Sequence, residues 1–293
     1  VDSIFFIYIS YNFYTRTIYS ILKNFSLYVV NVEFQPLPNI YEHLNFLEKI
    51  ITYFIKIKKR PILLYEKIFL KNNALKVNLL FSVFNRNSET ILIPSIDYER
   101  SQLAIDLIGS IGKYALFLDE GVGINNDYKK FFGEYKMRKM YLQKINTFFD
   151  WFEFKYNMSV VIAGHPRIDY DDNSFEGREV VLSKTEQYSK SAEYIFAHHS
   201  SSISYPIIFN KKLLFLDTKV LPYNTRIFLK CFVEELKIKK ILLDEEYTDM
   251  NLKNYFNINN YSIYQEKYLA SKKLKSNSVW EIILDELELR FNK

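Results

Sequence analysis

The stretch KYALFLDEG, residues 113–121, decides the fold class. It is a short, continuous apolar run that ends in two acids and a glycine. Such a run, closed by a turn residue, is typical of a strand that is buried on both faces of a parallel sheet. The stretch SVVIAGHPR, residues 159–167, repeats the pattern and ends in His165, Pro166 and Arg167. We therefore predict a parallel sheet in the second half of the chain.

Along the whole chain, short β-rich runs alternate with longer segments of helical period, which is the order of an α/β protein with parallel sheets. The predicted strands cover residues 3–9, 27–34, 89–95, 113–121, 159–167, 180–183, 194–197, 212–217 and 239–244. The predicted helices cover 13–25, 40–58, 61–85, 137–156, a small helix from Thr185, and 277–291. This order predicts two α/β lobes.

The domain boundaries follow from the distribution of glycine, because all seven glycines fall between Gly109 and Gly177. Tight connections and close backbone approaches should therefore concentrate in the middle of the chain. We predict an N-terminal lobe over residues 1–110, a second lobe over 111–275, and a last helix over 276–293 that packs back across the lobes. The chain starts without a methionine and almost inside a strand, so we expect the first lobe to be truncated.

Composition narrows the class of protein. The net charge of +5 is too mild to indicate a nucleic-acid partner, although it suits an anionic substrate or a membrane surface. A single cysteine, Cys231, excludes a disulfide framework and fits a reducing compartment. The sequence shows neither a signal peptide nor an apolar run of about 18 residues. We expect a cytoplasmic protein, with the basic run at 56–60 either a solvated helix end or a peripheral contact with the inner membrane.

Polar residues follow four of the predicted strands, and ligands of open parallel sheets bind outside the carboxyl ends of the strands. This convergence predicts a binding site. The residues are Asp97-Tyr98, Asp119-Glu120, His165-Pro166-Arg167, and His198 to Ser202.

Two of these strand ends are suited to a phosphate. His165 and Arg167 can approach an anion from two directions, with the guanidinium binding in a bidentate way. Ser200, Ser201 and Ser202 would lie at a helix N-terminus, where hydroxyls and backbone N–H groups bind phosphate. The alternative for the first strand end is a buried, hydrogen-bonded histidine beside a surface arginine. The alternative for the serines is that one of them only caps the helix. A zinc site is disfavoured because His198 and His199 point apart, and the chain has no G-x-S-x-G motif of a serine hydrolase.

In order along the chain, KYALFLDEG, VVIAGHPR and SKTEQYSKSAEYIFAHHSSSISYP resemble the C-terminal, nucleotide-binding half of GT-B glycosyltransferases of bacterial surface-carbohydrate biosynthesis. More distantly, they look like the CMP-sugar enzymes, the bacterial sialyl-, polysialyl- and Kdo-transferases with HP and serine motifs. The likeness covers roughly residues 111–220. In residues 1–110 it is limited to short segments that begin like strands. It implies a GT-B-like fold with two Rossmann-like lobes.

The resemblance also implies a function. It assigns His165 and Ser200–Ser202 to the nucleotide phosphate and places Thr185 beside the nucleotide. From the strand ends themselves we add Arg167 and His198 as candidate binding residues. Transfer needs a carboxylate as base or nucleophile, for which Asp97, Asp119 and Glu120 are the candidates.

The expected reaction moves a CMP-activated acidic sugar, such as Kdo or a nonulosonate, onto a glycan or glycolipid of the bacterial surface, without a metal or another cofactor. Two alternatives stay open. One is a transferase of the same fold that uses a UDP- or GDP-sugar or CDP-glycerol, and the other is a non-catalytic lobe that binds nucleotide or glycan.

Overall fold

The structure is a computed structural model that describes a large part of the chain. The described residues are 4–7, 28–33, 43–45, 48–49, 79–83, 89–105, 113–125, 138–171, 174–247, 249–270, 274 and 278–291. By its internal contacts the chain divides into a first unit, residues 1–36, 41–96 and 267–293, and a second unit, residues 37–40 and 97–266. The boundaries at 110 and 275 that the sequence suggested stay a prediction.

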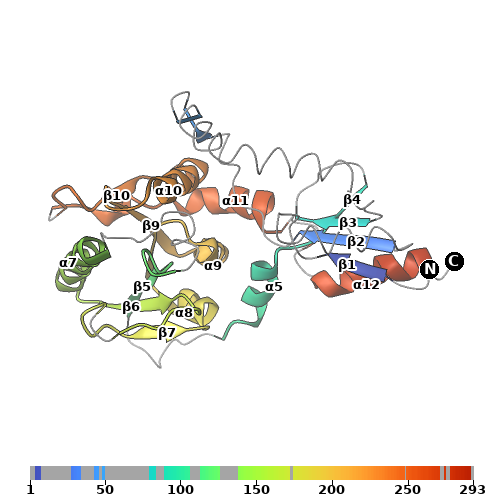
Figure 1. The fold of residues 1–293 in the computed structure, drawn as a ribbon, viewed down its shortest axis with the longest axis horizontal. Coiled ribbons are helices and arrows are strands. Elements are labelled where there is room, and N and C mark those ends of the chain that lie inside the picture. The colour runs from blue at the N-terminus through green and yellow to red at the C-terminus, as the bar shows by residue number, and fades with distance from the viewer. Residues whose placement is uncertain are drawn as a thin grey trace. The chain divides into compact units, whose positions relative to one another are not determined.

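The first unit contains a parallel sheet in the order β1-β2-β3-β4 (Figure 1). Its strands are β1 (Ile4–Ile7), β2 (Tyr28–Glu33), β3 (Leu79–Ser82) and β4 (Thr90–Leu92). Helix α12 (Val279–Phe291) packs on this sheet through Val279, Ile283 and Leu287, which are four residues apart and so lie on one face of the helix. The last predicted helix is thereby confirmed as a helix.

One prediction in this unit is wrong. Residues 61–85 were expected to be helical, but Leu79–Ser82 form a strand that pairs with β2 and β4. A short apolar run such as this one reads equally well as a strand or as a turn of buried helix, because periodicity cannot separate the two over four residues.

The second unit contains a six-stranded sheet whose neighbouring strands are all parallel, in the order β10-β9-β8-β5-β6-β7. The strands are β5 (Tyr114–Leu118), β6 (Ser159–Gly164), β7 (Val180–Leu182), β8 (Tyr194–Ala197), β9 (Lys212–Asp217) and β10 (Lys240–Leu242). The chain proceeds outward from β5 to β7 and then returns to the other side of β5. The strand order therefore reverses between β5 and β8, as in doubly wound dinucleotide-binding sheets.

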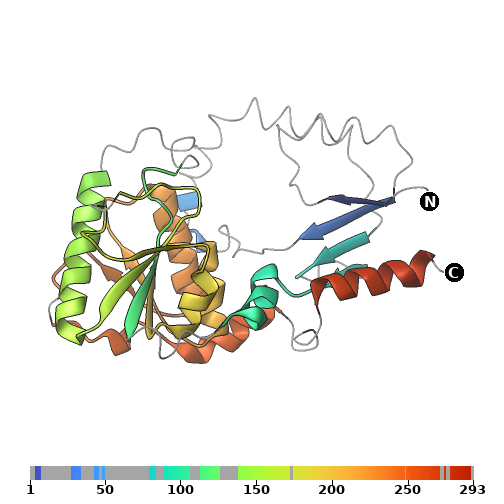
Figure 2. The same ribbon diagram turned by 90° about the horizontal axis from the view of Figure 1, so that it is seen from below.

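Helices cover both faces of this sheet (Figures 1 and 2). Phe117 packs on Phe149 of α7, whereas Phe215 stacks on Phe232 of α10 on the opposite face, because alternate strand residues point to opposite sides. The helices of the unit are α5 (Ile96–Leu103), α7 (Arg138–Tyr156), α8 (Thr185–Ser191), α9 (Ser204–Ile208), α10 (Tyr223–Leu236) and α11 (Tyr261–Tyr268), with 3₁₀ turns η1 (Ser201–Ile203), η2 (Leu252–Asn254) and η3 (Ile258–Asn260).

An aromatic cluster forms the core between α7 and the sheet. Phe148 and Phe152 of α7 meet Phe196 of β8 edge to face, with ring centroids 5.2 and 4.9 Å apart, and all three side chains are fully buried. Such pairs contribute about 0.5–1.5 kcal/mol each beyond the area they bury. The cluster holds the centre of the sheet rigid beneath the strand ends, where the predicted site residues lie.

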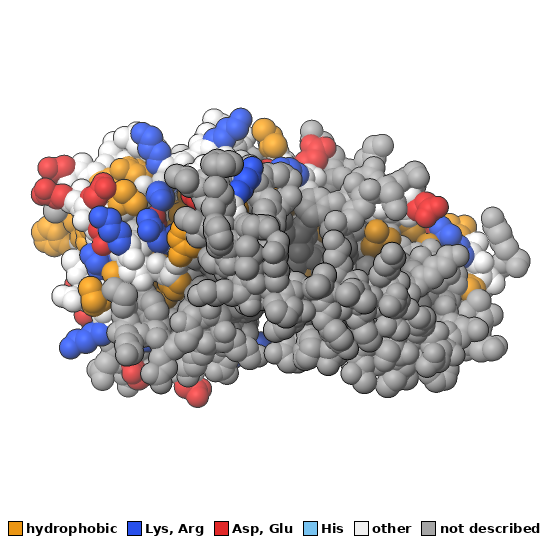
Figure 3. Space-filling model, turned by 45° about the horizontal axis from the view of Figure 1, so that its top comes forward, with side chains coloured by type: hydrophobic (Ala, Val, Ile, Leu, Met, Phe, Trp, Pro, Cys, Tyr) orange, Lys and Arg blue, Asp and Glu red, His pale blue; other side chains and the backbone are white. Residues whose placement is uncertain are grey.

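The surface of the described residues mixes charges of both signs. Figure 3 shows lysine and arginine side chains among aspartate, glutamate and apolar ones on the face in view. Within the described part of the chain, no helix combines the length and the hydropathy needed to cross a bilayer.

Candidate functional site

The strand ends that the sequence pointed to meet at the reversal of strand order. Asp119 and Glu120 follow β5, His165 and Arg167 follow β6, and residues 198–202 follow β8. Because β5 lies between β6 and β8 and all three run parallel, these residues share one edge of the sheet. We call residues 119–125, 165–170 and 198–202 the strand-end cluster.

Two glycines allow the segment after β6 to fold back onto the sheet. Gly121 has φ +64°, and a Cβ there would come within 1.8 Å of the Ile168 side chain. Gly164 lies under the ring of Tyr170, which a Cβ would approach to 2.7 Å. Side chains at these positions would displace the segment, so the glycines bring residues 165–170 close to Asp119.

Asp119 is buried, with 6% of its surface exposed. Its Oδ2 accepts hydrogen bonds from the Gly121 N–H at 3.0 Å and from the Tyr170 hydroxyl at 2.7 Å, while its Oδ1 has no hydrogen-bond partner in the described structure. Burial raises the pKa of Asp119 to about 6, although Tyr170, Arg138 and Gly121 act in the opposite direction. This carboxyl group is therefore set to exchange a proton close to neutral pH.

Glu120 is held differently, by His199. The backbone N–H of His199 donates to Oε1 of Glu120 at 2.7 Å, and the His199 ring forms an ion-pair contact with Oε2 through Nδ1. Burial alone would raise the pKa of Glu120, but the charge and the N–H groups of His199 outweigh it and lower the pKa below its usual value. Glu120 is therefore the carboxylate that stays ionised, and it links the ends of β5 and β8.

His198 points into the core, away from its neighbour. Its Nδ1 lies 2.6 Å from the Leu216 carbonyl oxygen and must donate to it, so Nε2 accepts from the Tyr141 hydroxyl at 3.0 Å. Burial lowers the pKa of His198. Both nitrogens of the neutral His198 ring are hydrogen-bonded, and these two bonds connect α7 and β9 to the end of β8.

His165 presents one ring nitrogen as a donor. The backbone N–H of Arg167 donates to its Nδ1 at 3.2 Å, so a neutral ring carries its proton on Nε2. The side-chain amide nitrogen of Asn125 lies 3.5 Å from that Nε2, and the amide accepts a hydrogen bond from the ring when it is turned so that its oxygen faces Nε2. The Arg167 side chain is exposed and takes part in no hydrogen bond or ion pair among the residues that the structure describes. A donor N–H and a guanidinium thus stand at the end of β6.

The serine run forms a 3₁₀ turn. Ser200 caps it, because its Oγ accepts a hydrogen bond from the Ser202 N–H at 3.2 Å. Ser201 is exposed and Ser202 is half-buried, so both hydroxyls lie near the surface of the strand-end cluster. Of the three serines, Ser200 is therefore the one that caps the turn.

One predicted site residue lies elsewhere. Asp97 was expected at a strand exit but lies in the first turn of α5, where its carboxylate accepts hydrogen bonds from Ser204 and Tyr205 of α9. Thr185 is the first residue of α8 and follows the carboxyl end of β7, which runs parallel to β6. Asp97 serves to join α5 to α9.

Sequence reasoning missed Tyr170 and the placement of His199. The Tyr170 hydroxyl accepts from the His165 backbone N–H at 2.6 Å and donates to Asp119, so it connects two strand ends. Nothing in a lone tyrosine five residues after HP signals this contact. The alternation of residues at a strand end does predict that His198 and His199 face opposite ways, but not which of them faces the core.

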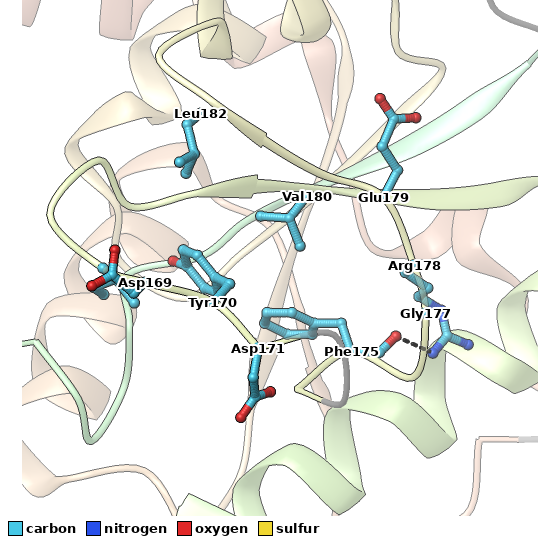
Figure 4. A pocket seen from close by; sticks show the side chains of 10 residues that line it. Asp169, Tyr170, Asp171, Phe175, Gly177, Arg178, Glu179, Val180 and Leu182 are labelled. Atoms are coloured by element: carbon cyan, nitrogen blue, oxygen red, sulfur yellow. Dashed lines mark hydrogen bonds between the residues drawn. The ribbon is translucent and has the colours of Figure 1, made fainter.

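A pocket of about 600 Å³ opens beside β7 (Figure 4). Tyr170, Phe175 and Val180 contribute aromatic and aliphatic walls, and Asp169 and Asp171 lie at its border. Among the described residues, no group of three or more His, Cys, Asp or Glu side chains is arranged to hold a metal ion.

Comparison with known proteins supports the fold assignment. No protein-family model and no curated protein sequence matches the chain. A solved structure described as the glycotransferase of kitacinnamycin matches with a TM-score of 0.52 at 9% identity, over 98% of this chain and 76% of that chain. The spinosyn forosaminyltransferase SpnP (TM-score 0.46, 8% identity, 94% and 73% covered) and Acinetobacter baumannii MurG (0.40, 8%, 96% and 72%) match too weakly to add support. The predicted fold class is confirmed: the chain has an α/β, GT-B-like fold with parallel sheets.

Proposed function

We propose that the chain is a glycosyltransferase that binds a nucleotide sugar at the strand-end cluster. The observation that supports this most is that an imidazole, an exposed guanidinium and two surface hydroxyls follow β6 and β8, the strands on either side of β5, at the end of the sheet where the strand order reverses. In doubly wound sheets this is where nucleotides bind. The site is built for an anion, since His165, Arg167 and the serine turn all supply donors.

The donor phosphate would contact His165 through Nε2 and Arg167 through its guanidinium. When the bond between the sugar and the phosphate breaks, negative charge builds on the leaving phosphate oxygen. A hydrogen-bond donor fixed at that oxygen stabilises the transition state more than the ground state. Ser201 and Ser202 would add hydroxyl contacts to the phosphate. We assign His198 a positioning role, because both of its ring nitrogens are already bonded within the protein.

We assign the proton acceptor to Asp119. A base works best when its pKa lies near the working pH, and burial moves the pKa of Asp119 to about 6. Glu120 is already paired with His199, and Asp97 is bonded to α9. In this scheme the acceptor hydroxyl gives its proton to Asp119 while its oxygen attacks the anomeric carbon of the sugar.

The donor that we propose is a CMP-activated acidic sugar, and the acceptor is a glycan or glycolipid of a bacterial surface. This finer assignment rests on the resemblance of the HP and serine motifs to those of CMP-sugar transferases. The basic run at 56–60, which would bring such an enzyme to a membrane surface, lies outside the described residues.

A thermal-shift screen of CMP, UDP and GDP, with and without Mg²⁺, tests the proposal. We expect CMP to stabilise the protein most, and without metal, because protein donors offset the phosphate charge. Equal shifts for all three nucleotides would remove the support for a CMP donor. A shift that requires Mg²⁺ would contradict the metal-free site. Binding without hydrolysis or transfer of any donor sugar would favour a non-catalytic lobe.

A further inference from the structure

We propose that the Tyr170 hydroxyl is a positioning group that ties the Asp119 carboxylate to the His165 segment and thereby sets the pH range in which the site works. This inference rests on the proposed function, since it takes Asp119 and His165 as its working residues. It adds a residue that touches neither donor nor acceptor in that scheme.

The directions of the two hydrogen bonds follow from the chemistry of the partners. The His165 backbone N–H can only donate, so the Tyr170 oxygen accepts from it at 2.6 Å. The single hydroxyl proton is then directed to Oδ2 of Asp119 at 2.7 Å. One oxygen atom therefore connects the end of β6 to the end of β5, and the position of each depends on the other.

The ring of Tyr170 is fixed so that the hydroxyl cannot turn away cheaply. It packs over Gly164 on one side, and Phe175 lies at 6.1 Å from it, centroid to centroid. Figure 4 shows the ring in the wall of the pocket beside β7, together with Phe175 and Val180. Burial and the Asp119 charge raise the pKa of Tyr170 well above its usual range, so the hydroxyl keeps its proton.

Asp119 has little other support for its charge. Oδ2 has the Gly121 N–H as its second donor, Arg138 contributes a nearby positive charge, and Glu120 contributes a negative one. Oδ1 has no partner in the described structure. Removal of the tyrosine proton would therefore take away one of two donors from a buried carboxylate. The charged form would become less favourable, and the pKa of Asp119 would rise.

Tyr170→Phe tests this directly, with Tyr114→Phe as the matched control. Tyr114 is the first residue of β5, at the opposite end of the strand from Asp119, and its hydroxyl donates to the Tyr188 carbonyl at 2.7 Å. Both substitutions remove one hydrogen-bonded hydroxyl group and keep the ring. Only Tyr170→Phe should alter the ionisation of Asp119.

The first readout needs no turnover. The difference in unfolding free energy between each protein and its Asp119→Asn derivative is measured from pH 4 to pH 8. In the parent this difference should fall as the pH rises above about 4 and level off near pH 6, the pKa of Asp119 in the folded protein. In Tyr170→Phe the pH at which the difference levels off should rise by about one unit, because a hydrogen bond to a charged group is of that size. Tyr114→Phe should leave that pH in place. An unchanged levelling-off pH in Tyr170→Phe would overturn the inference.

Replacement of Tyr170 by 3-fluorotyrosine covers the case in which Tyr170→Phe does not fold. This variant keeps the ring and makes the hydroxyl a stronger donor, so the pH at which the difference levels off should move downward. No movement in either direction would contradict the inference.

The second readout uses the reaction. If transfer is observed, the acidic limb of the kcat profile in Tyr170→Phe should shift to higher pH by the same amount, about one unit, while KM for the donor changes little. If no nucleotide binds at all, the proposed function fails, yet the first readout still decides the role of Tyr170.

Discussion

Two buried aspartates of the second unit have similar partners and different surroundings. Asp97, in α5, and Asp119, after β5, are 7% and 6% exposed, and each accepts a hydrogen bond from a tyrosine hydroxyl. Both oxygens of Asp97 have hydroxyl partners from α9, whereas Oδ1 of Asp119 has none among the described residues.

The difference teaches how to separate a structural polar group from a functional one. A buried polar group with all its partners stabilises the fold, and one that lacks a partner costs free energy and needs another explanation. Asp119 lies at the reversal of strand order and Asp97 lies in a helix contact. The two histidines differ in burial: His198 is fully buried and bonded in the core, whereas His165 is half-buried at the end of β6.

The histidine pair should give the largest effect. His165→Ala should lower kcat for transfer by about 10²-fold or more, with a smaller change in donor affinity, because the lost donor acts mainly in the transition state. His198→Ala should instead lower the free energy of unfolding, since it leaves the Leu216 carbonyl and the Tyr141 hydroxyl without partners. Steady-state kinetics and urea unfolding of both variants measure this. Near-normal transfer by His165→Ala would show that the leaving-group site is misplaced.

The aspartate pair should differ in the sign and the pH dependence of its effects. Because the pKa of Asp119 in the folded protein, about 6, lies above the ordinary value of 3.8, its ionisation destabilises the fold as the pH rises. Relative to Asp119→Asn, the parent should lose about 2 kcal/mol between pH 4 and pH 7. Asp97→Asn should cost about 1–3 kcal/mol at pH 7, through the hydroxyls it leaves unsatisfied. Parallel pH profiles for the parent and Asp119→Asn would refute the assignment.

The serine turn should give the smallest effect. Ser200→Ala removes a cap and should cost about 1 kcal/mol of stability. The double change of Ser201 and Ser202 to Ala should leave stability nearly unchanged and weaken nucleotide binding. Calorimetric titration with CMP and urea unfolding distinguish the two roles. A nucleotide affinity unchanged by the double substitution would mean that the turn only caps.

Much of the second unit could be predicted from the sequence. The strand predictions at 194–197 and 212–217 coincide with β8 and β9, because four to six apolar residues bounded by polar ones leave little ambiguity. Helix α7 could be predicted because its buried positions recur every three or four residues. Only its first residue was placed one position too early. The first unit was harder, because β3 is a short apolar run within a stretch that reads as helical.

The location of the site at the carboxyl ends of the strands could be predicted from the sequence, but the contacts between its side chains could not. Parallel strands bring their carboxyl ends to one edge, so Asp119 and His165 could be placed together. The contact through Tyr170 depends on the fold-back over Gly121 and Gly164, which is a tertiary event without a local sequence signal. Asp97 was misplaced because a strand was expected to run as far as residue 95, whereas β4 ends at Leu92.

The central claim is that a nucleotide binds at the strand-end cluster. Hydrogen–deuterium exchange of the protein with and without CMP tests it most directly, because backbone protection reports the location of binding independently of catalysis. We predict that CMP slows exchange in residues 119–125, 165–170 and 198–202, and leaves residues 96–103 of α5 unchanged. Protection confined to segments outside these three strand ends would contradict the account.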